Sequence, residues 1–358
     1  MNSLSLLSSP SVIIVPMERS PRFRLYAPGR RLLLHDMNER RQLTGVAGMA
    51  SVVAAGLLVL YRVAQRSWPA VFTGTGSDRF WLSAVSHLIG LCLIPFVAAG
   101  FIQIARKPSA RFVLGANKKW SPIVLSALIG VAMQLTWSGL SVFALQATRR
   151  TTVQTMPAFF TDGFVPLHSA LPVHLLVFVL GVLLTGSILV LFTFGYVAPG
   201  LDIGWHRARA VLGTALLFAL FFGDRALFPT MFLTGIMLTI IRLNTDSLYA
   251  TLAALISYFA VGVFKDIIFD QLALLFFGQT GLDAGHTYSL ALIVMLSGAA
   301  LFVPSIVFLS SMWRDQHLER MREAIAKAGD KALPSEPDRP FDFLYLIACL
   351  LLVAVLFV

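Results

Sequence analysis

Long apolar stretches alternate with short polar segments along this chain, and the repeat has the scale of a lipid bilayer. Five stretches have the roughly 17–25 residues that a helix needs to cross the hydrocarbon core of a membrane. They cover about 43–61, 80–104, 121–146, 173–197 and 288–311. A further apolar stretch, 342–358, is expected to insert as a terminal anchor. The pattern therefore predicts a chain that passes through a membrane several times.

The region 211–277 is also apolar, but charged residues interrupt it. The interruptions are Asp224, Arg225, Arg242, Asp246 and Lys265. We divide the region into three shorter helices at about 211–223, 228–242 and 248–264. Helices of this length are short for crossing a bilayer alone, so we expect neighbouring helices to shield them. The predicted fold class is all-α, a polytopic helical membrane protein with about eight or nine transmembrane helices.

The positions of Lys and Arg test this division, because the cytoplasmic segments of membrane proteins are enriched in both. With nine spans, basic residues are concentrated before the first span and in every second loop after it. These segments are 1–41, 105–120, 198–210, the turn at Arg242, and 312–341. The alternation predicts a cytoplasmic N-terminus and a C-terminus on the outer side.

The composition excludes a soluble fold. Hydrophobic residues make up 57% of the chain and charged residues 13%, and the mean hydropathy is +0.79. A soluble domain has about twice this share of charged residues. The formal net charge of +10 reflects the basic cytoplasmic segments, so we predict no nucleic-acid partner. Cys92 and Cys349 each lie within an apolar block, which leaves neither a disulfide framework nor a thiolate metal site.

We expect four parts in the chain. They are a basic cytoplasmic arm at 1–41, a transmembrane bundle at 42–311, a cytoplasmic amphipathic linker helix at 312–341, and the C-terminal anchor at 342–358. The arm is rich in Ser and Arg, a composition shared by organellar presequences, and Met17 and Met37 are open as alternative starts. The linker is predicted from apolar residues at helical spacing, and we expect it to lie on the headgroups.

The most specific stretch of sequence is Thr234 to Ala250, TGIMLTIIRLNTDSLYA, in which a short helix ending in Arg precedes a Ser that opens the next helix. Two further stretches lie upstream. They are Phe192 to Tyr196 (FTFGY) followed by Pro199, and Leu217 to Phe222 (LFALFF). The Thr234–Ala250 stretch resembles the third quarter of the CPBP family, the CAAX prenyl proteases and bacteriocin-processing intramembrane proteins. The two upstream stretches resemble the end of the family's first motif and its second motif. The resemblance covers roughly residues 185–264 and implies a CPBP-like core at about 173–277.

The resemblance also implies where the functional residues of a family protease would lie in this chain. Its two motif glutamates fall on Leu189 and Val190, and its arginine on Phe194. Its histidines fall on Phe222 and Leu255, and its asparagine on Phe259. Leu, Val and Phe can neither accept a proton nor bind a metal, so the resemblance implies a family fold without the hydrolytic site, with no catalytic residue and no cofactor.

Few other polar residues lie within or near the apolar stretches. His87, His174 and Asp224 are expected on the outer side, and they are weak candidates for a metal or proton-relay site. The competing interpretation is that they are ordinary interfacial polar groups, and we predict no metal. Gln134, and Asn244 with Asp246 at a helix junction, are expected to serve in interhelical hydrogen bonds and helix capping. Bound pigment, quinone or lipid stays open.

We therefore expect a multipass protein of a bacterial inner membrane, with an organellar membrane as the alternative location. Its expected role is that of a non-proteolytic scaffold or regulator, which acts through lateral contacts with a membrane-protein partner or a lipid of the bilayer. Two other functions stay open. One is an active intramembrane hydrolase with a non-standard site, and the other is a small-molecule or lipid transporter. The oligomeric state is not predicted.

Overall fold

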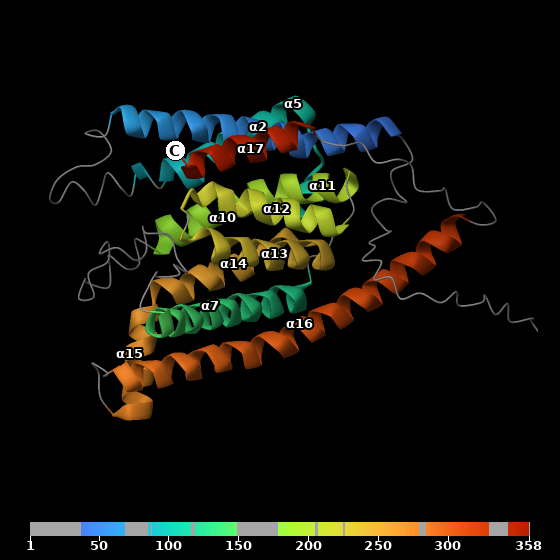
Figure 1. The fold of residues 1–358 in the computed structure, drawn as a ribbon. Helices are drawn as coiled ribbons and strands as arrows, with labels where there is room; N and C mark the ends of the chain where they lie inside the picture. Colours follow the sequence, from blue (N-terminus) through green and yellow to red (C-terminus); the bar gives the residue numbers. More distant parts are fainter. Residues whose placement is uncertain are drawn as a thin grey trace, which may run out of the picture.

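A computed structural model describes nine parts of the chain. These are residues 37–68, 85–86, 88–115, 119–148, 178–204, 207–224, 226–278, 284–328 and 343–357. Helices and turns make up this described part, apart from one isolated antiparallel bridge between Gly115 and Ser247. Figure 1 shows a bundle of long helices whose axes are roughly aligned. The all-α fold class is confirmed.

Five helical stretches among the described residues are long and apolar enough to cross a membrane. They are Gly45–Ser67, Ile89–Arg106, Trp120–Val142, Gly181–Ile203 and Gly285–Ser311. Each matches one of the five clear spans predicted from the sequence. A sixth span is counted if Leu248–Val263 and Ile267–Phe277, which meet at 65°, cross the membrane as one broken helix. The count of eight or nine spans stays a prediction.

The first half of the bundle contains long helices joined by short pieces. In chain order these are α2 (Met37–Ser67), the π-helical turn η1 (Ile89–Leu93), α5 (Ile94–Arg106), α6 (Ala110–Leu114) and α7 (Trp120–Thr148). The next span is a continuous run of η2 (Phe178–Thr185), α10 (Gly186–Val190), η3 (Leu191–Val197) and α11 (Ala198–Gly204). Its two π-helical segments flank α10, which contains Leu189 and Val190.

The three short helices predicted for 211–264 are present as separate elements. They are α12 (Arg207–Phe222), α13 (Phe228–Thr245) and α14 (Leu248–Val263). Local sequence explains each boundary. Gly223 ends α12 at φ +62, a left-handed conformation that glycine adopts without strain. Pro229 lies in the first turn of α13, and Ser247 caps the N-terminus of α14.

The helices after α14 include one correction to the sequence analysis. They are α15 (Lys265–Phe277), α16 (Ala284–Ala328) and α17 (Phe343–Phe357). The candidate span ends at Ser311, as expected, but the linker helix predicted to follow it is not a separate element. Helix α16 continues for 45 residues, to Ala328, and extends past the bundle in Figure 1. A helix-forming polar sequence directly after a span can prolong the same helix, and apolar spacing alone does not reveal the difference.

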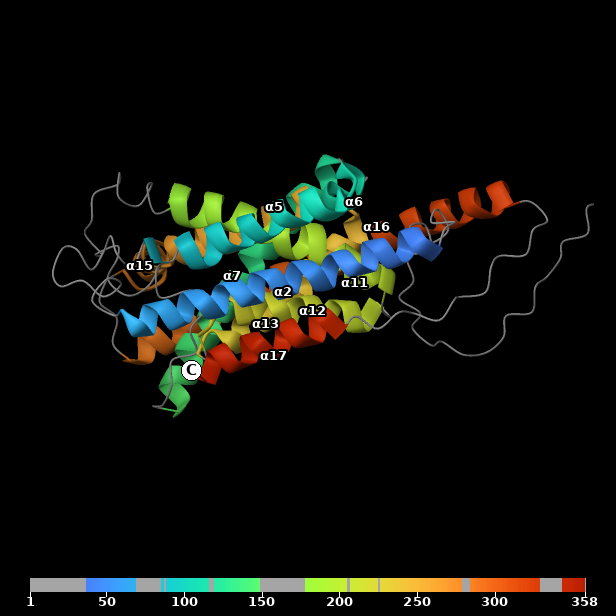
Figure 2. The same cartoon turned by 90° about the horizontal axis from the view of Figure 1, so that it is seen from above.

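The bundle is layered, with α2, α5 and α17 on one side and α16 on the opposite side (Figures 1 and 2). α7 packs between α14 and α16. Glycines allow this close approach, because a Cβ atom at Gly130 would lie 2.0 Å from the Ala254 carbonyl oxygen. Likewise, a Cβ at Gly139 would lie 2.6 Å from the carbonyl oxygen of Ala291. Small residues serve this purpose in membrane bundles, where packing must replace the hydrophobic effect.

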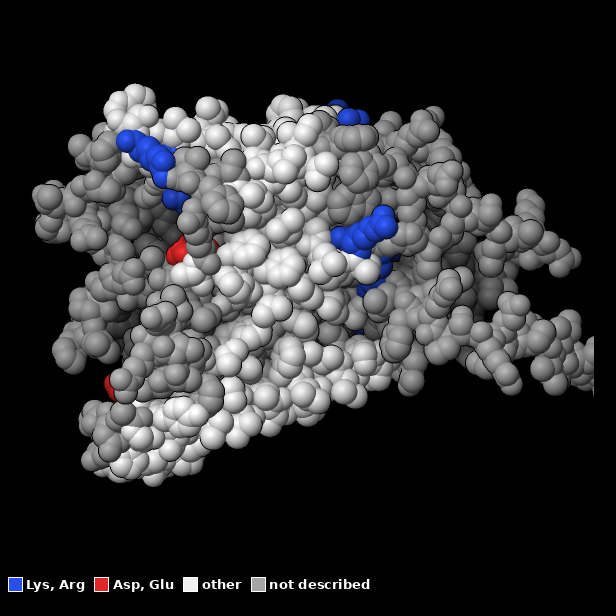
Figure 3. Space-filling view, viewed as in Figure 1, with Lys and Arg blue, Asp and Glu red and all other residues white. Residues whose placement is uncertain are grey.

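Charged side chains lie toward the two ends of the bundle on the face drawn in Figure 3, and the surface between them is uncharged. One end carries Arg62, Arg66 and Asp224, and the other carries Arg106 and Arg209. Large apolar side chains are exposed along the middle of the outer helices, for example Phe96 at 57% and Leu296 at 56%. This distribution suits a bilayer, where apolar surface meets lipid and charges meet the headgroups.

Candidate functional site at the centre of the bundle

The six positions onto which the resemblance would place functional residues lie on neighbouring parts of the bundle. Leu189 and Val190 are on α10, Phe194 is on η3, Phe222 ends α12, and Leu255 and Phe259 are on α14. Every one of these side chains is buried, and the most accessible of them, Phe222, exposes 7% of its surface. All six belong to one apolar cluster. The structure therefore places them in the core of the bundle.

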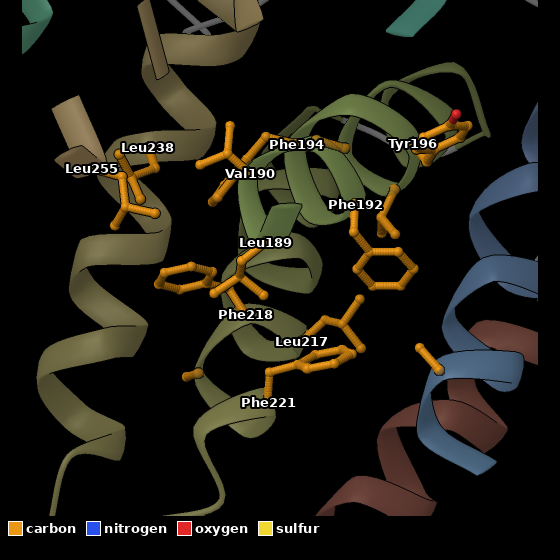
Figure 4. Close-up of a cluster of buried hydrophobic side chains, with 14 of the residues drawn as sticks. Leu189, Val190, Phe192, Phe194, Tyr196, Leu217, Phe218, Phe221, Leu238 and Leu255 are labelled. Atoms are coloured by element: carbon orange, nitrogen blue, oxygen red, sulfur yellow. The ribbon is translucent and has the colours of Figure 1, made fainter. Parts of the chain in front are cut away.

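Aromatic contacts connect η3 and α12 within this cluster. The ring centroids of Phe194 and Phe218 are 5.4 Å apart, and those of Phe218 and Phe222 are 5.3 Å apart. In Figure 4, Leu189 lies beside Phe218. Leu189, Phe194 and Phe222 are thus brought together around the ring of Phe218.

Helix α14 packs against the same cluster from another direction. A Cβ atom added to Gly186 would lie 3.9 Å from Cδ2 of Leu255 and 4.0 Å from Cδ2 of Phe259. Figure 4 shows Leu255 beside Leu238 and on the side of the cluster where Val190 lies. Because hydrocarbon side chains hold no proton acceptor and no metal ligand, these six residues can fill space but cannot activate a water molecule.

Arg242 lies at the end of a short helix, as expected from the sequence, but its surroundings differ from the cytoplasmic turn that we predicted. It lies in the last turn of α13 with its side chain fully buried. Its Nε donates to the carbonyl oxygen of Phe194 at 2.9 Å. Its Nη2 donates to the carbonyl oxygens of Phe112 at 3.2 Å and Val113 at 2.9 Å. Its Nη1 donates to Oδ1 of Asp246 at 3.2 Å.

We call this set of contacts the Arg242 junction: the side chains of Arg242 and Asp246 with the carbonyl oxygens of Phe112, Val113 and Phe194. The junction joins α6, η3 and α13. An unpaired cation would be very costly to bury, so the carboxylate and the carbonyl oxygens are needed to hold it in place. Its chemistry is that of a structural anchor, because an arginine stays protonated and cannot act as a base.

Two residues with positive φ, Asp246 and Gly115, bring the backbone segments around the Arg242 junction into close contact. Asp246 adopts a left-handed conformation at φ +49, and Ser247 accepts a hydrogen bond from the Ala250 amide at 3.4 Å. Gly115, at φ +86, meets this turn so closely that a Cβ atom would lie 2.0 Å from the Asp246 carbonyl oxygen. The sequence held a signal for this arrangement. Arg242 and Asp246 are four residues apart, which is the spacing of an intrahelical pair and not of two loop charges.

The hydrogen bonds expected of Asn244 and Gln134 have different outcomes. Nη2 of Arg207 on α12 donates to Oδ1 of Asn244 on α13, so the interhelical hydrogen bond expected of Asn244 is present. Gln134, by contrast, donates from Nε2 to Oγ of Ser138 at 3.2 Å within α7, where we expected a partner on another helix. An amide at one helical face can satisfy its donor on a hydroxyl one turn away, which sequence alone does not exclude.

The weak metal candidates are not assembled by the described part of the chain. Asp224 lies in the turn between α12 and α13, where its Oδ1 accepts a hydrogen bond from the Ala226 amide at 2.8 Å. His87 and His174 lie outside the described residues. Among the residues that are described, no group of three or more His, Cys, Asp or Glu side chains could hold a metal ion. Asp224 therefore acts here as a turn-forming residue.

Comparison of the chain with protein-family models, with curated proteins and with solved structures finds no match.

Proposed function

We propose that this chain is a multipass membrane protein with a CPBP-like core that does not hydrolyse peptides. In this proposal it acts as a scaffold or regulator through lateral contacts with a membrane-protein partner. The proposed topology has nine spans, with the N-terminus in the cytoplasm and the C-terminus outside, in a bacterial inner membrane. The observation that carries the proposal is the burial of Leu189, Val190, Phe194, Phe222, Leu255 and Phe259 in one apolar cluster.

The argument from this cluster is chemical. An intramembrane hydrolase needs a base to deprotonate water, and a carboxylate, an imidazole or a metal usually fulfils that role. The six positions supply only carbon, and their close packing supports a role in holding α10, α12 and α14 together. A helical bundle with no acid–base groups at these six positions is suited to binding a partner and not to hydrolysing a peptide.

The lateral contact is proposed for α16. The apolar window of this helix is 22% buried, compared with 44–72% for the other four candidate spans. Its exposed side chains include Leu296 at 56%, Val303 at 60% and Val307 at 61%. The opposite face packs on α7 through glycine, which fixes the orientation of the exposed face. A partner helix would find here the longest accessible apolar surface in the described part.

Site-specific photo-crosslinking in membranes tests this proposal. A photoreactive amino acid is placed at Leu296 or Val303 on α16, and at Phe101 on α5 as a matched exposed control. We expect the α16 positions to give an adduct with one defined membrane protein and the α5 position to give lipid adducts only. Lipid adducts at all three positions would contradict a protein scaffold.

The hydrolase alternative has its own test. The purified protein in lipid nanodiscs is incubated with a library of membrane-spanning peptides, and the products are analysed by mass spectrometry. We expect no cleavage. Cleavage that disappears in the Asp224→Asn variant would replace the scaffold proposal with an enzyme that uses the outer end of the bundle.

A further inference from the structure

An apolar stripe on the outer side of α5 is followed along the chain by a cationic segment. The stripe runs from η1 along α5 and contains Leu93, Val97, Phe101 and Ile104, which expose 51%, 46%, 49% and 77% of their surfaces. Their spacing of four, four and three residues places them on one side of the helix. The stripe ends directly before the charged residues of the α5–α6 segment.

Three of these charged residues form what we call the basic tip: Arg106, Lys107 and Arg111, all of which are exposed. The sequence contains no Asp or Glu between residues 79 and 161. At this end of the bundle, the carboxylates whose side chains are described, Asp202 and Asp246, are both 7% exposed. Among the side chains that the structure describes, the basic tip therefore has no exposed carboxylate beside it.

The dimensions of this face match one leaflet of a membrane. The stripe covers eleven residue steps from Leu93 to Ile104, which at a rise of about 1.5 Å per residue is about 16 Å. Half of a hydrocarbon core is about 15 Å. An acyl chain that lies along the whole stripe would therefore bring its headgroup to the level of Arg106 and Lys107.

The fold holds the basic tip in a defined position. Lys107 ends α5 in a left-handed conformation at φ +44, and Ser109 caps α6 by accepting a hydrogen bond from the Phe112 amide at 3.2 Å. The carbonyl oxygens of Phe112 and Val113, directly after Arg111, accept hydrogen bonds from the Arg242 junction. Figure 2 shows α6 beside the end of α5 at the edge of the bundle. Less conformational freedom is then lost when a headgroup binds.

We propose that this face binds an anionic phospholipid, with the phosphate among Arg106, Lys107 and Arg111 and an acyl chain along the α5 stripe. The recognition is electrostatic at the tip and apolar along the stripe, which suits a lipid better than a free phosphate ion. The inference deepens the proposed function by assigning a lipid to α5, while the protein contact is assigned to α16. The lipid site on α5 and the protein contact on α16 rest on different residues, so one proposal can fail while the other holds.

The test compares lipid binding by native mass spectrometry of the full-length protein in detergent. The probes are dioleoyl phosphatidylglycerol and dioleoyl phosphatidylcholine, and the reading is the ratio of the two adducts. We expect the protein to prefer phosphatidylglycerol and the triple variant Arg106→Gln, Lys107→Gln, Arg111→Gln to lose that preference about tenfold. Arg66→Gln, an exposed arginine at the other end of the bundle, is the matched control and should keep it.

Three further outcomes decide the proposal. If the triple variant does not fold, the single variants Arg106→Gln and Arg111→Gln replace it, and each should lower the preference about twofold to threefold. A preference that is unchanged in these variants overturns the site. Loss of the lipid adduct when millimolar inorganic phosphate is added would show recognition of the free ion instead, and this also overturns the proposal. Failure here leaves the crosslinking result at Leu296 and Val303 unaffected.

Discussion

A single arginine illustrates how polar groups are accommodated inside this bundle. Arg242 is 0% exposed, yet its donors reach one carboxylate and three carbonyl oxygens on other parts of the chain. The energetic importance of such a residue lies in what its loss leaves behind, because its partners were desolvated together with it. At the residue scale, the Arg242 junction is therefore the most sensitive point of the described structure.

Replacing the arginine should be far more damaging than removing its whole ion pair. Arg242→Ala leaves Asp246 buried without its cation, so we expect the free energy of unfolding to fall by about 3–5 kcal/mol. The double variant Arg242→Leu, Asp246→Leu should lose less. Unfolding of the purified protein in mixed micelles with increasing SDS measures both. Arg209→Ala, at an exposed position of α12, is the control, and equal losses in it and in Arg242→Ala would refute the structural role.

At the scale of helices, the packing of α16 depends on backbone contact. A Cβ atom at Gly298 would lie 2.5 Å from Oγ1 of Thr136 on α7 and 2.8 Å from the Ala132 carbonyl oxygen. Gly139 makes the reciprocal contact from α7. Because α16 contacts α7 far more extensively than its other described neighbours, α13 and α15, its position in the bundle follows mainly from its packing on α7.

A methyl group at either glycine should push the two helices apart. Gly139→Ala places a Cβ atom 2.6 Å from the Ala291 carbonyl oxygen, so we expect a loss of about 1–3 kcal/mol of unfolding free energy. Spin labels at Ser121 on α7 and Ser310 on α16, both exposed, should show a longer and broader distance distribution. Gly56→Ala is the control, because nothing lies within 4 Å of its Cβ position. An unchanged distance in Gly139→Ala would contradict this packing.

The elements of this fold differ in how far their sequence determines them. The five clear spans follow from apolar length, and Gly223, Pro229 and Ser247 mark the ends of the three short helices by their backbone preferences. The continuation of α16 to Ala328 could not be read in the same way, since spacing predicts a helix but not whether it joins the one before it. The length of an apolar stretch and the residues that end or cap a helix are local properties of the sequence. Whether one helix continues into the next depends on the tertiary structure around it.

The candidate site shows the same division between local and non-local information. The apolar character of Leu189, Phe222 and Leu255 is plain in the sequence, and their burial follows from it. The role of Arg242 is different, because its acceptors on Phe112 and Phe194 come from segments far away along the chain. The four-residue spacing to Asp246 indicates an ion pair, but the burial of that pair follows only from the fold, which brings the carbonyl oxygens to it.

The whole molecule has two chemically different ends, and their difference decides its orientation in a membrane. The basic tip lies at the end where α2 begins, since Nη2 of Arg106 is 3.8 Å from the Cβ position of Gly45. At the other end, Arg62 and Arg66 are accompanied by Asp224. Unbalanced positive charge is retained on the cytoplasmic side of a membrane. We therefore predict that the basic tip faces the cytoplasm.

Cysteine labelling tests this orientation, in a background where Cys92 and Cys349 are replaced by alanine. Ser67→Cys reports on the far end of α2, and Ser121→Cys reports on the end of α7 that follows the basic tip; both positions are exposed. In intact cells, a membrane-impermeant maleimide should label Ser67→Cys only, and Ser121→Cys should react after the membrane is permeabilised. The opposite pattern would invert the topology. Labelling of both cysteines from outside would mean that these ends of α2 and α7 do not lie on opposite sides of a bilayer. It would also contradict the assignment of the phospholipid site to the cytoplasmic leaflet.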